Sequence, residues 1–95
     1  MPFKAEWPVT VVQEVADELD LHGKTAEEAI PLLDRFLEDS YNANKRRVWI
    51  VHGKGTGALR RAVNQRLRNY RFVKSHVAAD SRRGGDGATQ VDIVD

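Results

Sequence analysis

A chain of 95 residues supports one domain, with a core just large enough for independent folding. Its composition, 41% hydrophobic and 31% charged, is typical of a globular protein and excludes a wholly disordered chain. Cysteine is absent, and no apolar stretch approaches the roughly 20 residues of a membrane span. The first residues lack the basic and apolar regions of a secretory signal. We therefore expect a cytoplasmic protein without disulfides and without a membrane partner.

The net charge of +1 is the sum of segments with opposite charge. Residues 1–44 hold three basic and ten acidic side chains, whereas residues 45–83 hold twelve basic and one acidic. Nine of those twelve are arginine, whose guanidinium group suits bidentate contact with phosphate. This pattern favours a surface that binds a polyanion. The alternative is that the basic segment folds back against the acidic one.

Residues 1–13 contain two prolines and show little periodicity, so we predict a flank or linker there and the domain proper over 14–95. A first strand is predicted over Val15–Leu21, where apolar and polar side chains alternate near its end. Gly23 then ends this strand.

The first helix has the clearest sequence signal. Thr25 and Glu28 have the spacing of a capping box at its start. Apolar residues follow at helical spacing and form one face: Ala29, Ile30, Leu33, Phe36, Leu37 and Tyr41. Pro31 removes one backbone donor near the second turn, and residues 42–44 are a natural end.

The rest of the chain is predicted to contain three more strands and a second helix. These elements are a strand at Arg47–His52, a helix from Gly57 or Ala58 to about Tyr70, and strands at Phe72–Ala79 and Thr89–Val94. The order β-α-β-α-β-β predicts an α/β two-layer sandwich, with a four-stranded mixed sheet and both helices on one face. The predicted core is Leu33, Phe36, Leu37, Val48, Ile50, Leu59, Val63, Leu67, Val91 and Ile93.

Asp20 and His22 are the first candidates for chemistry. They stand two residues apart in a predicted strand, so they share one face. A carboxylate beside an imidazole can orient the ring and prepare it for proton transfer. The alternative is a histidine that caps a turn at the strand end, beside a solvated Asp20.

The segment 52–60, His-Gly-Lys-Gly-Thr-Gly-Ala-Leu-Arg, follows a buried strand and opens a helix. Alternating glycines let the backbone curl, so that successive N–H groups converge on an anion beside the positive end of the helix. The residues assigned to phosphate binding here are Gly53, Lys54, Gly55, Thr56, Gly57, Arg60 and Arg61. The alternative is a tight turn that holds no ligand.

Two nucleotide-binding motifs are not present in this chain. The glycines of segment 52–60 do not have the G-x-G-x-x-G spacing of a dinucleotide site. Residues 23–25 read Gly-Lys-Thr like the end of a P-loop, but Glu18 stands where its first glycine belongs. The sequence therefore argues against an NTPase or a Rossmann domain.

The segment 82–89 is both basic and rich in glycine. Arg82 and Arg83 precede Gly-Gly-Asp-Gly-Ala-Thr, and such a loop between strands could grip backbone phosphates. It could equally be a flexible connection. His76 lies on a predicted strand, and we expect it to be structural.

Taken together, segments 19–23, 52–60 and 84–89 resemble the Smr (small MutS-related) domain, and the resemblance extends over about Val15 to Asp95. It implies the sandwich described above, which is similar to the C-terminal domain of translation initiation factor three. It also implies binding to branched or single-stranded nucleic acid, with nicking-endonuclease or RNase activity in many members. It further implies the C-terminal domain of a larger, dimeric bacterial MutS paralogue; such paralogues suppress recombination or act on collided ribosomes.

We therefore expect a nucleic-acid-binding domain that nicks DNA, or RNA, in a structure-selective way. Asp20 would orient His22 as the general acid or base, and His52 is either a second proton-transfer group or part of a structural turn. On RNA such a histidine pair could activate the 2′-hydroxyl without a metal. On DNA a water must attack, and Mg²⁺ or Mn²⁺ held by Asp20 becomes an option. The alternative function is a non-catalytic module that docks on DNA, RNA or the ribosome.

Overall fold

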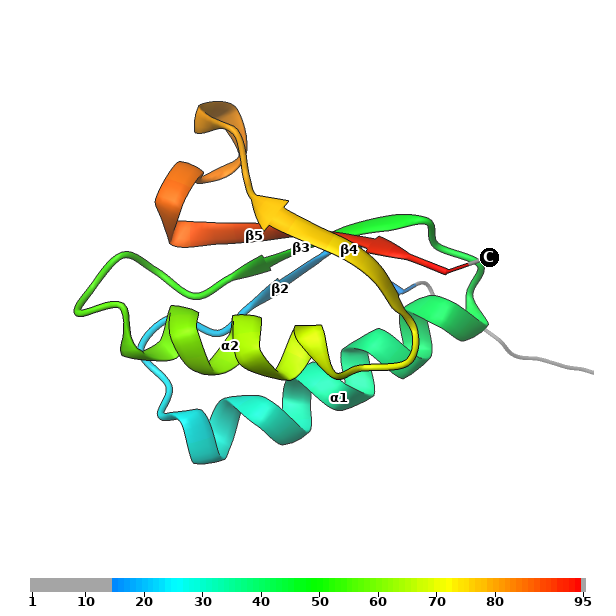
Figure 1. Ribbon diagram of the computed structural model, residues 1–95, viewed down its shortest axis with the longest axis horizontal. Helices are drawn as coiled ribbons and strands as arrows, with labels where there is room; N and C mark the ends of the chain where they lie inside the picture. Colours follow the sequence, from blue (N-terminus) through cyan, green and yellow to red (C-terminus); the bar gives the residue numbers. More distant parts are fainter. Residues whose placement is uncertain (1–14, 95) are drawn as a thin grey trace, which may run out of the picture.

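The computed structural model describes residues 15–94 and has two layers, a sheet and a pair of helices on one of its faces (Figure 1). Its elements are β2 (Glu18–Asp20), α1 (Ala26–Asn42), β3 (Arg47–Val51), α2 (Ala58–Arg68), β4 (Val73–Ala78), the short 3-10 helices η1 (Ser81–Arg83) and η2 (Gly85–Gly87), and β5 (Ala88–Ile93). The predicted two-layer α/β sandwich is confirmed. The flank predicted over 1–13 lies outside the described residues. Among residues 15–94, no helix is both long and apolar enough to span a membrane.

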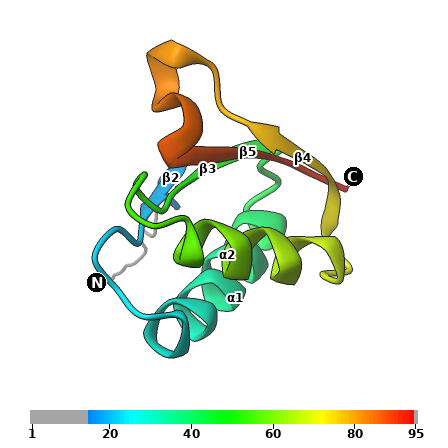
Figure 2. The same cartoon turned by 60° about the vertical axis from the view of Figure 1, so that its left-hand side comes forward.

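The sheet has the strand order β2-β3-β5-β4 and is mixed, as predicted. β2 runs parallel to β3, whereas β5 is antiparallel to both of its neighbours, β3 and β4. The crossovers through α1 and α2 therefore both connect parallel strands. Right-handed crossovers in the same direction place both helices on one face of the sheet, as Figure 2 shows.

The capping box at the start of α1 is formed in both directions. The backbone N–H of Glu28 donates to Thr25 Oγ1 at 3.2 Å, and the N–H of Thr25 donates to Glu28 Oε1 at 3.0 Å. Pro31 lies inside the helix, which continues to Asn42. The predicted start and end of this helix are therefore confirmed.

The core lies between the sheet and the two helices. Eight of the ten predicted core residues are buried, and Phe36 and Leu59 are partly buried and pack against them. Leu21 and Ala29 complete the buried cluster. Between the helices, the guanidinium of Arg66 forms two hydrogen bonds with the carboxylate of Asp34, at 2.8 and 2.9 Å. This pair holds α2 against α1.

Two predicted segments differ in detail from the structure. β2 has three residues in place of the seven predicted over 15–21, and it lies at the edge of the sheet beside β3. The N–H of Leu21 still donates to Val51 O beyond the end of the strand. The predicted loop 81–87 contains two short 3-10 helices. They form because the carboxylate of Asp80 accepts from the N–H of Arg82 at 2.9 Å, and because Gly84 takes a φ of +112°.

We expect Leu33→Ala to lower the free energy of unfolding by about 2–5 kcal/mol, because Leu33 is fully buried and its truncation leaves a cavity. The matched control is Leu32→Ala, since Leu32 is 44% exposed on the same helix. That variant should change stability by less than about 1 kcal/mol. Urea unfolding of the two variants measures the difference, and equal losses would contradict the observed packing of α1.

Candidate functional site

Three segments that are distant in the sequence meet at one end of the sheet, at the left of Figure 1. The carbonyl oxygen of Gly87 accepts hydrogen bonds from the N–H groups of His52 and Gly53, at 3.0 and 2.9 Å. A Cβ atom on Gly53 would lie 3.4 Å from the Cβ of His22. The three motifs found in the sequence therefore form a single site.

Asp20 and His22 form a close pair at this site. Nδ1 of His22 lies 2.6 Å from Oδ1 of Asp20, and the backbone N–H of His22 donates to the same oxygen at 3.0 Å. The side-chain hydrogen bond from His22 is the main reason that the pKa of Asp20 lies below its ordinary value. An ionised carboxylate only accepts, so Nδ1 carries the proton and Nε2 is left for proton exchange. The pair is open to solvent, with side-chain exposures of 70% for His22 and 52% for Asp20.

His52 lies in a different environment, although the sequence suggested proton transfer for it as well. His52 is buried. Its Nδ1 lies 3.0 Å from the carbonyl oxygen of Gly53, and its Nε2 lies 2.9 Å from Oγ1 of Thr89. Burial lowers the pKa of His52. Oγ1 of Thr89 is also 3.3 Å from Oδ1 of Asn64 on α2. His52 thus connects the loop to β5 and to α2.

The partners of His52 were missed by sequence reasoning. Thr89 was assigned only to the last strand, although it belongs to the segment 84–89 that was singled out. Asn64 has no local sequence signal, because it lies on α2 between residues of ordinary helical spacing.

The glycines of the 52–60 segment adopt the backbone conformations that only glycine takes easily. Gly53 and Gly57 have φ values of +79° and +85°, and Gly57 is the N-cap of α2. A residue in this conformation turns the chain sharply into the helix. The hydroxyl of Thr56 accepts from the N–H of Ala58 at 3.3 Å, so Thr56 contributes to the start of the helix.

A cavity of about 210 Å³ lies over this loop, and its lining consists of Gly23, Lys24 and residues 52–60. Lys54 and Arg60, both predicted to bind phosphate, are therefore part of the same cavity. Lys24 also lines it and was not assigned a role from the sequence, although its position beside Gly23 was the available signal. The N-terminus of α2 adds its partial positive charge.

The other predicted arginines lie around this cavity or away from it. Arg61 is exposed, and its Nη1 would be 3.4 Å from a Cβ atom on Gly57. Arg82 is exposed on η1. The guanidinium of Arg83 lies over the indole ring of Trp49, with Cζ 3.8 Å from the ring centroid. Arg83 is therefore engaged on the sheet, and sequence reasoning missed Trp49 as its partner.

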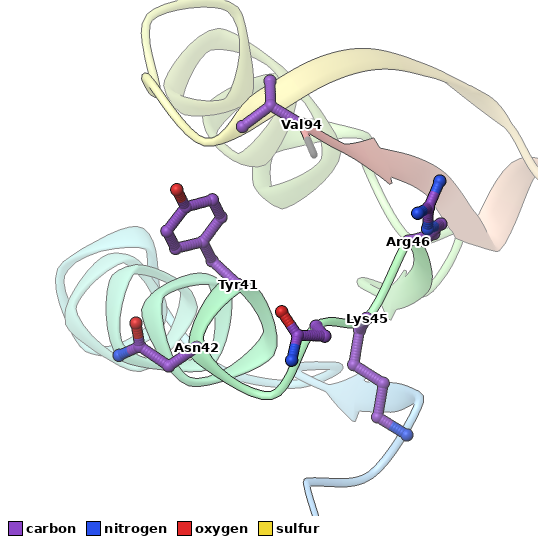
Figure 3. A pocket seen from close by; sticks show the side chains of 6 residues that line it. Tyr41, Asn42, Lys45, Arg46 and Val94 are labelled. Carbon is purple, nitrogen blue, oxygen red and sulfur yellow. The ribbon is translucent and has the colours of Figure 1, made fainter.

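A second cavity, of about 270 Å³, lies at the opposite end of β3 (Figure 3). Its lining comprises Tyr41, Asn42, Asn44, Lys45, Arg46 and Val94. None of the residues predicted from the sequence motifs lies there. Cavity volume therefore does not select the candidate site, whereas the convergence of the three motifs does.

Comparison with known proteins bears on this arrangement. The family profile of the Smr domain matches residues 19–94. The chain belongs to the Smr domain family. It is 45% identical, over 82 residues, to the endonuclease MutS2 of Clostridium beijerinckii, and this alignment covers 86% of this chain and 10% of that protein. It is 42% identical to the endonuclease MutS2 of Geobacillus kaustophilus over an alignment of 96 positions, which covers 97% of this chain and 12% of that protein.

Solved structures agree with this assignment. The Smr domain of Thermus thermophilus MutS2 superposes with a TM-score of 0.81 at 38% identity, covering 84% of this chain and all of that one. YdaL, a stand-alone small MutS-related protein from Escherichia coli, superposes with a TM-score of 0.80 at 26% identity, and the superposition covers 83% of this chain and 65% of that one. The chain spans about a tenth of the length of the curated MutS2 relatives.

The described residues of this chain offer few ligands for a metal ion. Residues 15–94 contain no group of three or more His, Asp or Glu side chains that could hold one. Asp20 and His22 supply at most a pair of donors, and Oδ1 of Asp20 already accepts from His22. A divalent ion at Asp20 would therefore take its remaining ligands from phosphate oxygens and water, as Mg²⁺ commonly does.

We expect His22→Ala to raise the pKa of Asp20 towards its ordinary value, because the side-chain hydrogen bond of His22 is the largest cause of its lowering. The stabilising effect of the pair is present above the ordinary pKa of an aspartate and is lost as the pH falls through the lowered value. Carboxyl ¹³C NMR titration measures the change. The internal control is Asp92, whose pKa Arg47 lowers and which should not move. An Asp20 resonance that titrates alike in both proteins would contradict the pairing.

Proposed function

We propose that this Smr domain binds a nucleic-acid strand in the cavity lined by residues 52–60 and nicks the strand beside His22. The observation that carries the proposal is that the Asp20–His22 pair lies beside the loop of residues 52–60, because a Cβ atom on Gly53 would be 3.4 Å from the Cβ of His22. A phosphate-binding loop next to an oriented imidazole has the parts that phosphodiester cleavage requires. The curated relatives named endonuclease MutS2 support the same reaction class.

The electrostatics of the cavity support phosphate binding. Its lining includes the first turn of α2, whose partial positive charge attracts an anion. Lys24, Lys54 and Arg60 surround it with full positive charges. These contacts carry no base information, so the domain would hold many sequences with similar affinity.

The chemical step would use His22 and the loop together. Nε2 of His22 would exchange a proton with the nucleophile or with the leaving oxygen, while Asp20 holds the ring and stabilises the imidazolium. Lys54 and the N–H groups of the loop would stabilise the charge that develops on the phosphate. Proton transfer by His52 stays a prediction. Its burial and its two hydrogen bonds favour a positioning role, in which it holds the loop against β5.

The substrate decides which nucleophile is available. RNA carries a 2′-hydroxyl that His22 could activate as a general base. DNA has no such group, so a water must attack, and a Mg²⁺ or Mn²⁺ ion at Asp20 would supply an activated water. We propose DNA as the first substrate to test, since the relatives in which this domain occurs carry the MutS2 name, and RNA as the second.

A second candidate is a non-catalytic module that docks a larger MutS-like protein on DNA, RNA or the ribosome. The observation that favours it is the exposure of the Asp20–His22 pair, because acid–base and electrostatic catalysis gain most where water is excluded.

We expect the double variant Lys54→Ala/Arg60→Ala to bind all single strands and branched duplexes more weakly, because two phosphate contacts are lost. The slope of log affinity against log salt concentration should fall by about 2. Fluorescence anisotropy at several salt concentrations measures both. The matched control is Arg35→Ala, which removes an exposed cation on α1 and should bind like the wild type. Full affinity in the double variant would refute the cavity as the binding site.

We expect His22→Ala to reduce cleavage by about 10²–10⁴-fold with binding unchanged, because general acid–base catalysis contributes that much. Nicked, branched and single-stranded DNA and RNA are incubated with each protein, with and without EDTA. Sensitivity to EDTA would indicate the metal-assisted route, and 2′,3′-cyclic phosphate ends would indicate attack by the 2′-hydroxyl.

The matched control is His76→Ala, a histidine on β4 at the other edge of the sheet. It should cleave like the wild type. Equal cleavage by wild type and His22→Ala would remove His22 from the mechanism. Binding by both without cleavage of any substrate would favour the docking module.

A further inference from the structure

The face of the sheet that the helices leave uncovered carries an arginine–tryptophan stack. Side chains alternate along β3, and Val48 and Ile50 point into the core, so Trp49 lies on the opposite face. The register pairs Trp49 with Glu18 and Val51 with Asp20. Trp49 therefore lies on the same face of the sheet as Asp20. It is two residues before Val51, the partner of Asp20, which is a separation of about 7 Å along β3.

The stack is formed by a residue from the other end of the chain. Cζ of Arg83, on η1, lies 3.8 Å from the centroid of the Trp49 ring, which is the contact distance of a guanidinium plane on an aromatic face. Figure 2 shows η1 and η2 rising from the sheet on the side away from the helices. Arg83 itself is exposed. One face of its guanidinium thus meets Trp49 while the residue remains accessible to a ligand.

The backbone of η1 fixes the position of Arg83. The carbonyl oxygen of Asp80 accepts from the N–H groups of Arg83 and Gly85, both at 2.9 Å, and the carboxylate of Asp80 accepts from the N–H of Arg82. Because the turn and the indole ring already restrict Arg83, a ligand that stacks on it loses less side-chain entropy than on a free arginine.

We propose that Arg83, positioned over the ring of Trp49, is a stacking platform for one unpaired nucleobase of the strand whose phosphate lies in the cavity of residues 52–60. Guanidinium planes and aromatic rings both stack nucleobases. A base in an intact duplex is already stacked on both sides, so this platform would select a single-stranded or splayed nucleotide. The inference rests on the proposed function, and it adds a base-binding subsite to the phosphate site.

The test compares a short oligothymidylate with the same strand in which abasic sites replace the bases, because the two carry equal charge. We expect the wild type to bind the intact strand about tenfold more tightly. Arg83→Lys keeps the charge without the plane, so it should lose this preference while its affinity for the abasic strand is unchanged. The matched control is Arg82→Lys, the exposed neighbouring arginine, which should keep the preference.

A second measurement does not depend on a variant of the stack. Trp7 and Trp49 are the two tryptophans of the chain, so in Trp7→Phe the emission reports Trp49 alone. The intact strand should change this emission, and the abasic strand should not. Equal affinity of the wild type for both strands, or a preference that survives Arg83→Lys, would overturn the platform and leave the phosphate site standing. Failure of the wild type to bind either strand would count against the proposed function itself.

Discussion

The close approach of Gly87 to the loop after β3 is the constraint on which the site depends. Its carbonyl oxygen accepts from two consecutive N–H groups, those of His52 and Gly53, and so joins the start of β5 to the loop. A Cβ atom on Gly87 would lie 3.3 Å from Cγ of Lys54 and 3.5 Å from the carbonyl carbon of Gly53. An alanine at this position would contact the Lys54 side chain closely, and a shift of a few tenths of an ångström in that flexible side chain would relieve the contact. The position of the loop that carries Lys54 therefore depends mainly on two backbone hydrogen bonds to a residue that is far from it in the sequence.

His52 connects the same loop to the interior of the domain through its hydrogen bonds. Because burial lowers its pKa, the imidazole is neutral at neutral pH, and with a proton on Nδ1 it donates to Gly53 O while Nε2 accepts from Thr89. The Thr89 hydroxyl has one proton and lies between two acceptors, Nε2 of His52 and Oδ1 of Asn64. The shorter contact, 2.9 Å against 3.3 Å, is the one that a neutral His52 requires. The two histidines of the site thus differ in role: His22 is solvent-exposed with Nε2 open, whereas both nitrogens of His52 are hydrogen-bonded.

Local rules predicted most of the fold and only part of the site. The capping box at Thr25 and the alternation in β3 depend on residues within a few positions, and both were predictable. The three motifs could be found in the sequence for the same reason. The Thr89 contact of His52 and the stack of Arg83 on Trp49 join residues 37 and 34 positions apart, so they exist only once the sheet order is fixed. The alternation of side chains along β3 could predict that Trp49 faces away from the core. No local sequence pattern, however, identifies Arg83 as the residue that packs on it.

The role of the charged side chains could also be predicted only in part from the sequence. The basic segment 45–83 predicted a polyanion-binding surface, and the alternative was that it folds back on the acidic segment. Some of its cations do pair with the acidic segment, namely Lys45 with Asp17 and Arg66 with Asp34. Others have different internal partners: Arg47 pairs with Asp92, Arg71 lies over Phe72 and Arg83 lies over Trp49. Lys54 and Arg60 instead line the cavity at the start of α2. A surface that binds phosphate is thus smaller than the sequence charge suggests, and part of it is concentrated at the positive end of α2, which favours the binding of one or two phosphates there over a broad electrostatic patch.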